Sequence, residues 1–407
     1  MSRHRIERLG HLGDGIAEGP VHAPLTLPGE TVEGRLEGTR LADIRIVTPS
    51  SNRVTPPCRH FRACGGCRLQ HAEDGFVAEW KMEQVRTALA AQGITAEIAR
   101  IETSPRGSRR RATFAARRTK KGAMAGFHGR ASGEITEIPD CTLLHPDLMA
   151  ALPAARDLAL AGGSRKAVLD VASTICENGI DIRAEGGKSL DGPLRQNLAD
   201  IAARHDLARL SWADEVVAAR RAPVLRIGRA MVTPPPGAFL QATAEGAASL
   251  LSEMRRITDG SKRVVDLFAG CGTFALPLAE TAHVHAVEAD AGMLSALDHG
   301  WRHAQGLKPV TCEKRDLFRD PLTAAELANH DAAVIDPPRA GAAAQTAELA
   351  ASRISTIAFA SCNPVTFARD ARRLLESGYV AGPIVVVDQF RWSAHVELVA
   401  EFRYTRA

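Results

Sequence analysis

The stretch that decides the fold is "DLFAGCGTFA", residues 266–275. It ends a short apolar run and leads into a segment with helical periodicity, and Gly270 and Gly272 lie at the turn between them. Glycines at these places permit the tight turn and the close backbone approach that a strand–loop–helix nucleotide site requires. The stretch therefore predicts a cofactor loop at the end of the first strand of an α/β sheet.

The chain around this loop has a regular rhythm from residue 262 onward. Apolar runs typical of strands alternate with helical stretches, and these runs are residues 262–269, 283–290, 310–317, 331–338, 354–361, 382–390 and 395–402. No helical stretch separates the last two runs. The pattern predicts a doubly wound sheet that is mostly parallel and has an antiparallel last strand.

Two cofactors are compatible with the loop. It fits the G-x-G-x-x-A pattern of NAD sites, and Glu288 ends the second strand 22 residues after Asp266, where a carboxylate accepts ribose hydroxyls. Asp266 before the turn and the motif "DPPR" (336–339) at the end of the fourth strand favour S-adenosylmethionine over NAD.

The motif "DPPR" also indicates the kind of methyl acceptor. Enzymes that methylate exocyclic amines typically have an aromatic residue where this chain has Arg339. A carbon acceptor is therefore favoured, and it needs a different activation. Cys362, in "SCNPVTFARD" (361–370), is either a small buried side chain at a strand end or a nucleophile displayed where a strand gives way to a helix.

Three of the eight cysteines crowd into "CRHFRACGGC", as Cys58, Cys64 and Cys67, and Cys141 follows after 73 intervening residues. With no secretory signal at the start of the chain, these four predict a metal site rather than disulfides. Zinc sites with four cysteines usually comprise two close pairs, whereas iron–sulfur clusters accept three clustered thiolates and a distant one. The spacing favours an iron–sulfur site, with zinc as the alternative.

The segment "RGSRRRATFAARRTKKG" (106–122) contains eight arginines and lysines and no acidic residue. One hypothesis is a solvated basic face, and the other is a strip that binds the phosphates of a nucleic acid. The whole chain has a formal net charge of only +4, so the positive charge is concentrated here.

The remaining patterns suggest three domains. Residues 1–50 are short alternating stretches broken by glycine and proline, which predicts a small β-barrel. Residues 51–232 form a mixed α+β domain that contains the cysteines and a helix over 76–92, and residues 233–407 form the doubly wound domain. With 45% hydrophobic residues, no signal segment and no stretch long enough to cross a membrane, a cytoplasmic protein without membrane attachment is expected.

Six motifs together resemble the RNA 5-methyluridine methyltransferase family, over nearly the whole chain. They are "CRHFRACGGCRLQH" (58–71), "FLQAT" (239–243), "DLFAGCGTF" (266–274), "DPPRAG" (336–341), "SCNPVTFARD" (361–370) and "HVE" (395–397). The resemblance implies an amino-terminal TRAM barrel, which is OB-like, a central RNA-binding domain with a four-cysteine [4Fe-4S] cluster, and a class I S-adenosylmethionine-dependent methyltransferase domain.

The resemblance also implies roles for individual residues. Cys362 corresponds to the nucleophile and Glu397 to the general base, and the metal ligands are Cys58, Cys64, Cys67 and Cys141. The cofactor positions are Gln241, Phe268, Thr273, Glu288, Asp316 and Asp336. The chain departs from its relatives at Thr243 and Thr273, where asparagine is usual, and at Phe390–His395, where relatives tend to have Phe-Pro-x-Thr-x-His.

This chemistry accounts for a cysteine at position 362. Carbon 5 of uracil is too weak a nucleophile to attack a sulfonium methyl group, but a thiolate added to carbon 6 turns it into an enolate carbon. A base then removes the proton from carbon 5. We therefore expect a monomeric enzyme that methylates a uridine in structured RNA, with large-subunit ribosomal RNA favoured over transfer RNA. The alternative from another class is an RNA-binding module without activity.

Overall fold

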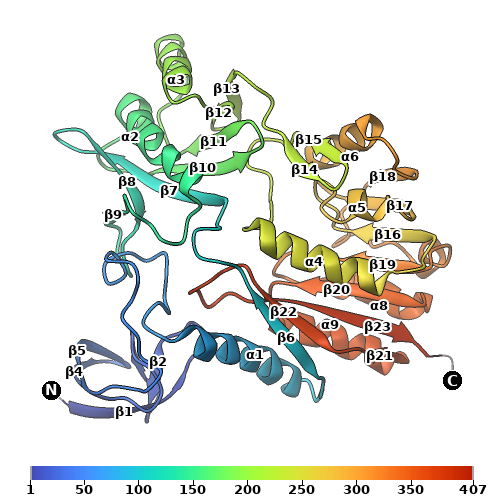
Figure 1. The fold of residues 1–407 in the computed structure, drawn as a ribbon, viewed down its shortest axis with the longest axis horizontal. Coiled ribbons are helices and arrows are strands. Elements are labelled where there is room, and N and C mark those ends of the chain that lie inside the picture. The colour runs from blue at the N-terminus through green and yellow to red at the C-terminus, as the bar shows by residue number, and fades with distance from the viewer. Residues whose placement is uncertain (1, 406–407) are drawn as a thin grey trace.

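The computed structural model describes residues 2–405 and divides into a small barrel, a seven-stranded sheet and a nine-stranded sheet (Figure 1). The closed barrel has the strand order β1-β2-β3-β5-β4. Its strands are β1 (Ser2–Leu9), β2 (Gly15–Ala17), β3 (Val21–Ala23), β4 (Thr31–Glu37) and β5 (Arg40–Thr48). A closed barrel at this end of the chain agrees with the alternating pattern of residues 1–50.

The nine-stranded sheet contains all seven strands predicted after residue 262. They are β16 (Arg263–Leu267), β17 (His283–Glu288), β18 (Val310–Lys314), β19 (Ala332–Ile335), β20 (Thr356–Ser361), β22 (Ile384–Asp388) and β23 (Glu397–Tyr404). The order is β18-β17-β16-β19-β20-β23-β22-β6, and the short β21 (Tyr379–Ala381) pairs with β23. The last strand, β23, is antiparallel to both of its neighbours, β20 and β22.

The order of strands determines where a ligand can bind. From β16 the chain runs outward in one direction through β17 and β18, and then returns to the other side of β16 with β19. Such a reversal opens a crevice at the carboxyl ends of the strands. The loops that follow β16, β17, β18, β19, β20 and β22 all lie at this edge.

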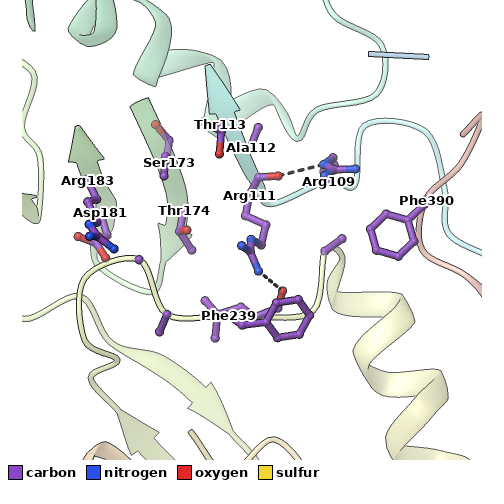
Figure 2. Close-up of a pocket in the computed structure, with 15 residues that line it drawn as sticks. Arg109, Arg111, Ala112, Thr113, Ser173, Thr174, Asp181, Arg183, Phe239 and Phe390 are labelled. Atoms are coloured by element: carbon purple, nitrogen blue, oxygen red, sulfur yellow. Dashed lines mark hydrogen bonds between the residues drawn. The ribbon is translucent and has the colours of Figure 1, made fainter. Parts of the chain in front are cut away.

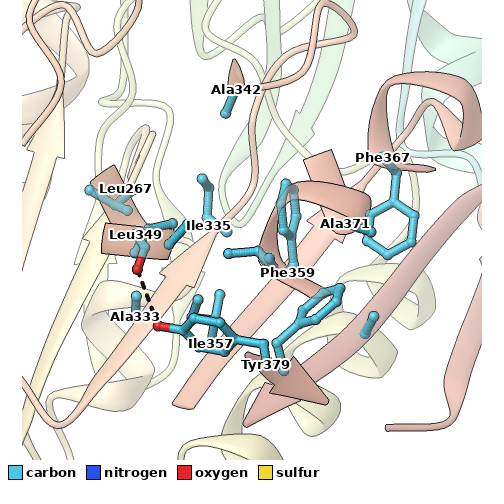
Figure 3. Close-up of a cluster of buried hydrophobic side chains, with 14 of the residues drawn as sticks. Leu267, Ala333, Ile335, Ala342, Leu349, Ile357, Phe359, Phe367, Ala371 and Tyr379 are labelled. Carbon is cyan, nitrogen blue, oxygen red and sulfur yellow. Dashed lines mark hydrogen bonds between the residues drawn. The ribbon is translucent and has the colours of Figure 1, made fainter. Parts of the chain in front are cut away.

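Helices cover both faces of the nine-stranded sheet. On one face lie α4 (Ala244–Ile257), α5 (Ala275–Leu278) and α6 (Ala291–His303). On the other lie α1 (Asp74–Ala90), α7 (Ala324–Leu327), α8 (Ala343–Ser352) and α9 (Pro364–Glu376). Figure 3 shows the second core, in which Phe359 of β20 meets Phe367 of α9 edge-on and the Tyr379 hydroxyl donates to the carbonyl of Leu349 at 3.1 Å.

Part of the segment 51–232 lies with the nine-stranded sheet. Strand β6 (Ile98–Thr103) pairs in parallel with β22, and helix α1, predicted over 76–92, begins two residues earlier and packs on α9. A buried ion pair joins α1 to the sheet, because Lys81 Nζ lies 2.5 Å from Asp388 Oδ1 and donates to the carbonyl of Phe390 at 3.1 Å. Burial lowers the pKa of Lys81, so its ammonium depends on Asp388 for stabilisation.

The rest of the central region forms the seven-stranded sheet, in the order β13-β12-β11-β10-β7-β8-β9. Its strands are β7 (Arg111–Arg118), β8 (Ala123–His128), β9 (Ile135–Glu137), β10 (Leu169–Cys176), β11 (Gly179–Glu185), β12 (Arg209–Trp212) and β13 (Glu215–Ala219). Helices α2 (Ala151–Gly162) and α3 (Gly192–Arg204) pack on this seven-stranded sheet. The hairpin of β14 (Leu225–Ile227) and β15 (Ala230–Val232) then leads to the nine-stranded sheet. Within residues 2–405, no helix is long and apolar enough to cross a bilayer.

Candidate active site

The fold brings Cys362 and Glu397 together at the carboxyl edge of the nine-stranded sheet. Cys362 directly follows β20, and Glu397 is the first residue of β23. Ser361 pairs with Leu398 in the antiparallel ladder, so the next position outward places Cys362 opposite Glu397. Residues that are 35 positions apart in the sequence thus become neighbours because β23 runs back toward the end of β20.

Glu397 is a buried carboxyl with an altered acidity. Only 5% of it is exposed. Burial and the neighbouring Asp336 raise the pKa of Glu397 to about 8, although a hydrogen bond from Gln389 works in the opposite direction. At neutral pH the group is therefore divided between its protonated and ionised forms, as is common for a general base whose pKa is matched to its task.

Cys362 is partly exposed, in contrast to a fully packed core thiol. Burial, Glu397 and Asp336 raise the pKa of Cys362 to about 11, and the guanidinium of Arg339 acts against them. The free enzyme consequently holds a thiol rather than a thiolate at neutral pH. Asn363 fixes the adjacent backbone, since its Oδ1 accepts from Val365 N at 3.1 Å at the start of α9 and its Nδ2 donates to the carbonyl of Arg339 at 2.9 Å.

A chain of side-chain amides connects Glu397 with Asp336. Gln389 Nε2 donates to Glu397 Oε2 and also to Gln241 Oε1, the latter at 2.5 Å. Gln241 Nε2 donates in turn to Asp336 Oδ2 at 3.3 Å. Burial raises the pKa of Asp336 to about 6, and the amide of Gln241 partly offsets this. The sequence predicted Gln241, Asp336 and Glu397 as site residues but did not single out Gln389.

The glycine loop after β16 is shaped by backbone hydrogen bonds to Glu288. Gly270, at φ +56°, donates its N–H to Glu288 Oε2 at 3.0 Å, and Asp290 N donates to Oε1 at 2.8 Å. Phe268 also has a positive φ, +64°, which a non-glycine residue rarely adopts. Such strain marks a loop whose conformation the surrounding structure imposes, as at ligand sites.

The other predicted cofactor residues border the same loop. Phe268 lies 5.4 Å, ring centre to ring centre, from the exposed Phe318, and Asp316 Oδ1 accepts from Phe318 N at 3.0 Å. Thr273 is partly buried just before α5. Asp266, before the loop, is fully buried. Burial and Asp336 raise its pKa well above the ordinary value, and the backbone N–H of Ala275 acts against them.

The four predicted metal ligands lie near one another. Cys58, Cys67 and Cys141 pack together around Phe61 and Trp392, and Cys64 belongs to the adjoining core with Cys141. Burial raises the pKa of Cys67 to about 12, and the charges of the other three thiols add to the rise. Gly66 N donates to Cys64 Sγ at 3.3 Å. In the described part of the chain, no group of three or more Cys, His, Asp or Glu side chains is arranged to hold a single metal ion.

The basic segment 106–122 is divided by the fold into two places. At its start, Arg109, Arg110 and Arg111 are partly buried, and burial lowers the pKa of all three. Their guanidinium groups donate to backbone carbonyls of Arg111, Gln241 and Leu240, at 3.0, 3.2 and 2.6 Å respectively. This arrangement differs from a solvated basic face.

A pocket of about 260 Å³ lies beside these arginines, between β7, β10 and the segment before α4 (Figure 2). The guanidinium of Arg111 lies 5.1 Å from the ring centre of Phe239, which is 59% exposed, and that of Arg109 lies 5.7 Å from Phe390. Asp181 also lines the pocket, but both of its oxygens are bonded to Arg209. The pocket therefore presents cations and aromatic faces beside the sheet edge.

The other end of β7 borders a second basic pocket, of about 390 Å³. Four cationic residues from three segments of the chain line it, namely Arg118 and Lys120 at the end of β7, Arg165 after α2 and Lys188 after β11. The hydroxyl residues Thr119 and Ser164 complete its polar lining, and its lining residues include no carboxylate. The sequence pattern predicted the first two cations but not Arg165 or Lys188, which are distant in the chain.

Comparison with known proteins identifies the family. The model of the tRNA (uracil-5-)-methyltransferase family matches residues 304–400, a range that includes Asp336, Cys362 and Glu397. An uncharacterised RNA methyltransferase of Brucella suis is 43% identical over 398 residues, covering 97% of this chain and 96% of its own. The 23S rRNA (uracil(1939)-C(5))-methyltransferase RlmD of Shewanella piezotolerans is 31% identical, covering 98% and 94%. The chain belongs to the RNA uracil-C5 methyltransferase family.

A solved structure shows the same fold. The crystal structure of the Pyrococcus abyssi tRNA (uracil-54, C5)-methyltransferase in complex with S-adenosyl-L-homocysteine has a TM-score of 0.76. It is 21% identical and covers 98% of this chain and 99% of its own. The chain is thus an S-adenosylmethionine-dependent RNA (uracil-C5)-methyltransferase, and the predicted enzyme class is confirmed.

Proposed function

We propose that the enzyme methylates carbon 5 of a uridine in large-subunit ribosomal RNA through a covalent bond between Cys362 and carbon 6. The observation on which this rests is that Cys362 follows β20 and Glu397 begins β23, each one position beyond the ladder pair of Ser361 with Leu398, at the sheet edge that also holds the glycine loop. A buried carboxyl with a pKa near 8 beside a partly exposed thiol supplies both groups that this chemistry needs.

Each group has a defined task in the reaction. Cys362 loses its proton to solvent and its sulfur bonds to carbon 6, which places the electron pair of the ring double bond on carbon 5 and O4. Carbon 5 would then bond to the methyl carbon as the bond from that carbon to the sulfonium sulfur breaks, with S-adenosylhomocysteine as the leaving group, and the hydrogen on carbon 5 becomes acidic. The carboxylate of Glu397 takes this proton, the carbon 6–sulfur bond breaks, and Cys362 leaves as a thiolate. The positive charge of Arg339 favours the thiolate of Cys362, both before it adds to carbon 6 and when it leaves.

The loop residues suit S-adenosylmethionine, which supplies an electrophilic methyl group when bound. Glu288 already orients two backbone amides and retains lone pairs for ribose hydroxyls. The exposed ring of Phe318 beside Phe268 offers an apolar face for an adenine base. Gln241 and Asp336 lie on the side of the loop nearest Glu397, and Asp316 and Thr273 complete the set that we assign to this cofactor.

The basic pockets at the two ends of β7 suit RNA. Cations next to exposed aromatic rings bind phosphates and stacked bases together, as expected of a surface for unpaired nucleotides. Large-subunit ribosomal RNA is favoured because of the RlmD relative and the barrel at residues 2–48, which we assign as a TRAM barrel. The alternative substrate is transfer RNA, on which the Pyrococcus abyssi protein of similar fold acts according to its name.

The cysteine arrangement supports a [4Fe-4S] cluster held by Cys58, Cys64, Cys67 and Cys141. Four cysteines are the donor set that such a cluster takes, and Cys58, Cys64 and Cys141 all lie near enough to Cys67 to influence its pKa. A zinc ion with bonds of about 2.3 Å would instead need all four sulfurs in a tight tetrahedron. The methylation has no redox step, so we assign the cluster to the structure of the central domain, which we place within residues 51–232.

The test uses RNA in which the target uridine is replaced by 5-fluorouridine, because fluorine at carbon 5 cannot be removed by a base. The wild-type protein should form an adduct that survives denaturing electrophoresis and requires S-adenosylmethionine. Cys362→Ala should form none. Cys312→Ala is the matched control, because Cys312 is also partly exposed with a pKa of about 11 but lies on β18. RNA binding without any wild-type adduct would indicate the inactive RNA-binding module instead.

A further inference from the structure

Gln389 is a buried amide whose role the established chemistry does not assign. It follows β22 and only 2% of it is exposed. Its Oε1 accepts from the backbone N–H of Ala242 at 2.6 Å and from that of Thr243 at 3.4 Å. Its Nε2 faces two acceptors, Glu397 Oε2 and Gln241 Oε1.

The backbone contacts determine which end of the amide faces Glu397. A backbone N–H can only donate, so the oxygen of Gln389 must point toward Ala242 and Thr243. The nitrogen, with its two hydrogens, is then left to donate once to Glu397 and once to Gln241. Rotating the amide would place N–H against N–H at one end and oxygen against carboxylate at the other. The surrounding structure therefore holds a single orientation.

We propose that Gln389 is a positioning residue that holds the carboxylate of Glu397 in its working orientation and joins it to the cofactor-site residue Gln241. The inference rests on the proposed function of Glu397 as the base. Gln241 in turn donates a hydrogen bond to Asp336, which follows β19. The side-chain amides of Gln389 and Gln241 therefore connect the ends of β19 and β22 with the start of β23.

The charges around Glu397 explain why such a donor is needed. The titratable groups that face Glu397 or its immediate neighbours are Asp336, Asp388, Cys362, Arg339 and Lys81. Asp388 is already paired with Lys81, whereas Asp336 disfavours a second negative charge. The hydrogen bond from Gln389 lowers the pKa of Glu397 against burial and Asp336. Without it the pKa rises, and the ionised base forms only at higher pH.

The test is Gln389→Met, which keeps the length of the side chain and removes the two hydrogen bonds that Nε2 donates and the two that Oε1 accepts. With RNA that contains ordinary uridine, decay of the methylated adduct is measured by rapid quench from pH 6.5 to 9.5. At pH 7 we expect decay to slow by about tenfold, as for one unit of pKa. The pH profile should shift to higher pH, and the dissociation constant for S-adenosylmethionine should rise by a smaller factor. Gln389→Glu, which retains size and polarity, should shift the profile in the same direction.

Gln345→Met is the matched control. Gln345 is a fully buried glutamine on α8 that bonds to the backbone N and O of Leu322, at 2.9 and 3.0 Å. Its loss should lower the melting temperature and leave the pH profile in place. If Gln389→Met and Gln389→Glu also change only the melting temperature, Gln389 is structural and the inference is wrong. That result is distinguishable from failure of the proposed function, in which the wild-type protein forms no adduct at all.

Discussion

If Glu397 is the general base that we propose, its acidity makes resolution of the covalent adduct dependent on pH. The base acts in its ionised form, and its pKa is about 8. The ionised fraction is then about 1% at pH 6, about 10% at pH 7 and about 90% at pH 9. If proton removal limits adduct decay, its rate should rise roughly tenfold per pH unit up to pH 8 and level off above it.

A single-turnover assay separates this step from adduct formation. Enzyme, labelled S-adenosylmethionine and uridine-containing RNA are mixed and quenched in denaturant, and the methyl label is counted in protein-bound and in free RNA. Formation depends on the thiolate of Cys362, and because the pKa of this thiol is about 11, formation also becomes faster with pH over this range. The adduct is therefore formed first at one pH and then shifted to another, and the protein-bound methylated RNA should decay slowly at pH 6.5 and rapidly at pH 9.

The variant Glu397→Gln should remove the pH dependence of decay by leaving the adduct trapped at every pH. Addition and methyl transfer do not need this carboxylate, so the trapped RNA should carry the label even without fluorine. Loss of a general base typically slows its step by about 10²–10⁴-fold. Normal turnover in Glu397→Gln, or a decay rate of the wild-type adduct that is the same at pH 6.5 and 9, would refute the assignment, and His395 would then be tested as the base.

Two further predictions concern RNA and iron. Replacing Arg165 and Lys188 with alanine should flatten the log–log dependence of RNA affinity on salt by slightly under two units, because two phosphate contacts are lost. Lys166→Ala, one residue away and outside the second pocket, should leave the slope unchanged, and equal slopes in all variants would show that the pocket does not bind phosphate. Anaerobically purified protein should contain about four irons and four sulfides per chain, and Cys141→Ser should lose them together with RNA affinity while still binding S-adenosylmethionine. Stoichiometric zinc in place of iron would contradict the cluster.

The sequence was sufficient for the strands after residue 262 because each is a short apolar run between turn residues. Cys362 and Glu397 were assigned from the sequence only through the resemblance to the family. The structure brings them to one edge because an antiparallel last strand begins where the preceding strands end. Strand β6 was not predicted, because it lacks such an apolar run. Its sequence, "IARIET", alternates weakly and lies far from the sheet that it joins, so only tertiary pairing with β22 identifies it.

Gln389 and the second basic pocket could not be predicted for a related reason. Gln389 is one polar residue in the strand end "VVVDQF", and nothing local distinguishes it from a solvent-facing residue. Its role depends on its hydrogen bonds to Gln241, which is 148 positions away, and to Glu397. Likewise, Arg165 and Lys188 join the end of the basic segment only because α2 and β11 end beside β7. Both sites depend on chain topology rather than on sequence spacing.

Trp392 anchors the loop between Gln389 and Glu397 to the cysteine segment. Trp392 is 1% exposed and packs against Phe61 and Cys67. Its carbonyl accepts from the backbone N–H of Arg68 at 2.8 Å, and its indole N–H donates to Asp74 at 3.2 Å. These contacts of Trp392 join the cysteine segment to the loop that precedes Glu397.

This contact predicts a coupling between two variants far apart in sequence. Trp392→Ala should lower the free energy of unfolding by about 3–5 kcal/mol, as for other large buried side chains, and should slow adduct decay. Cys141→Ser should slow decay as well, because Trp392 then packs on a disordered segment. If both act through the same contact, the double variant should be little worse than the more severe single variant, since neighbouring sites are not additive. Fully additive effects on the decay rate would show that the cysteine segment and the catalytic loop are independent.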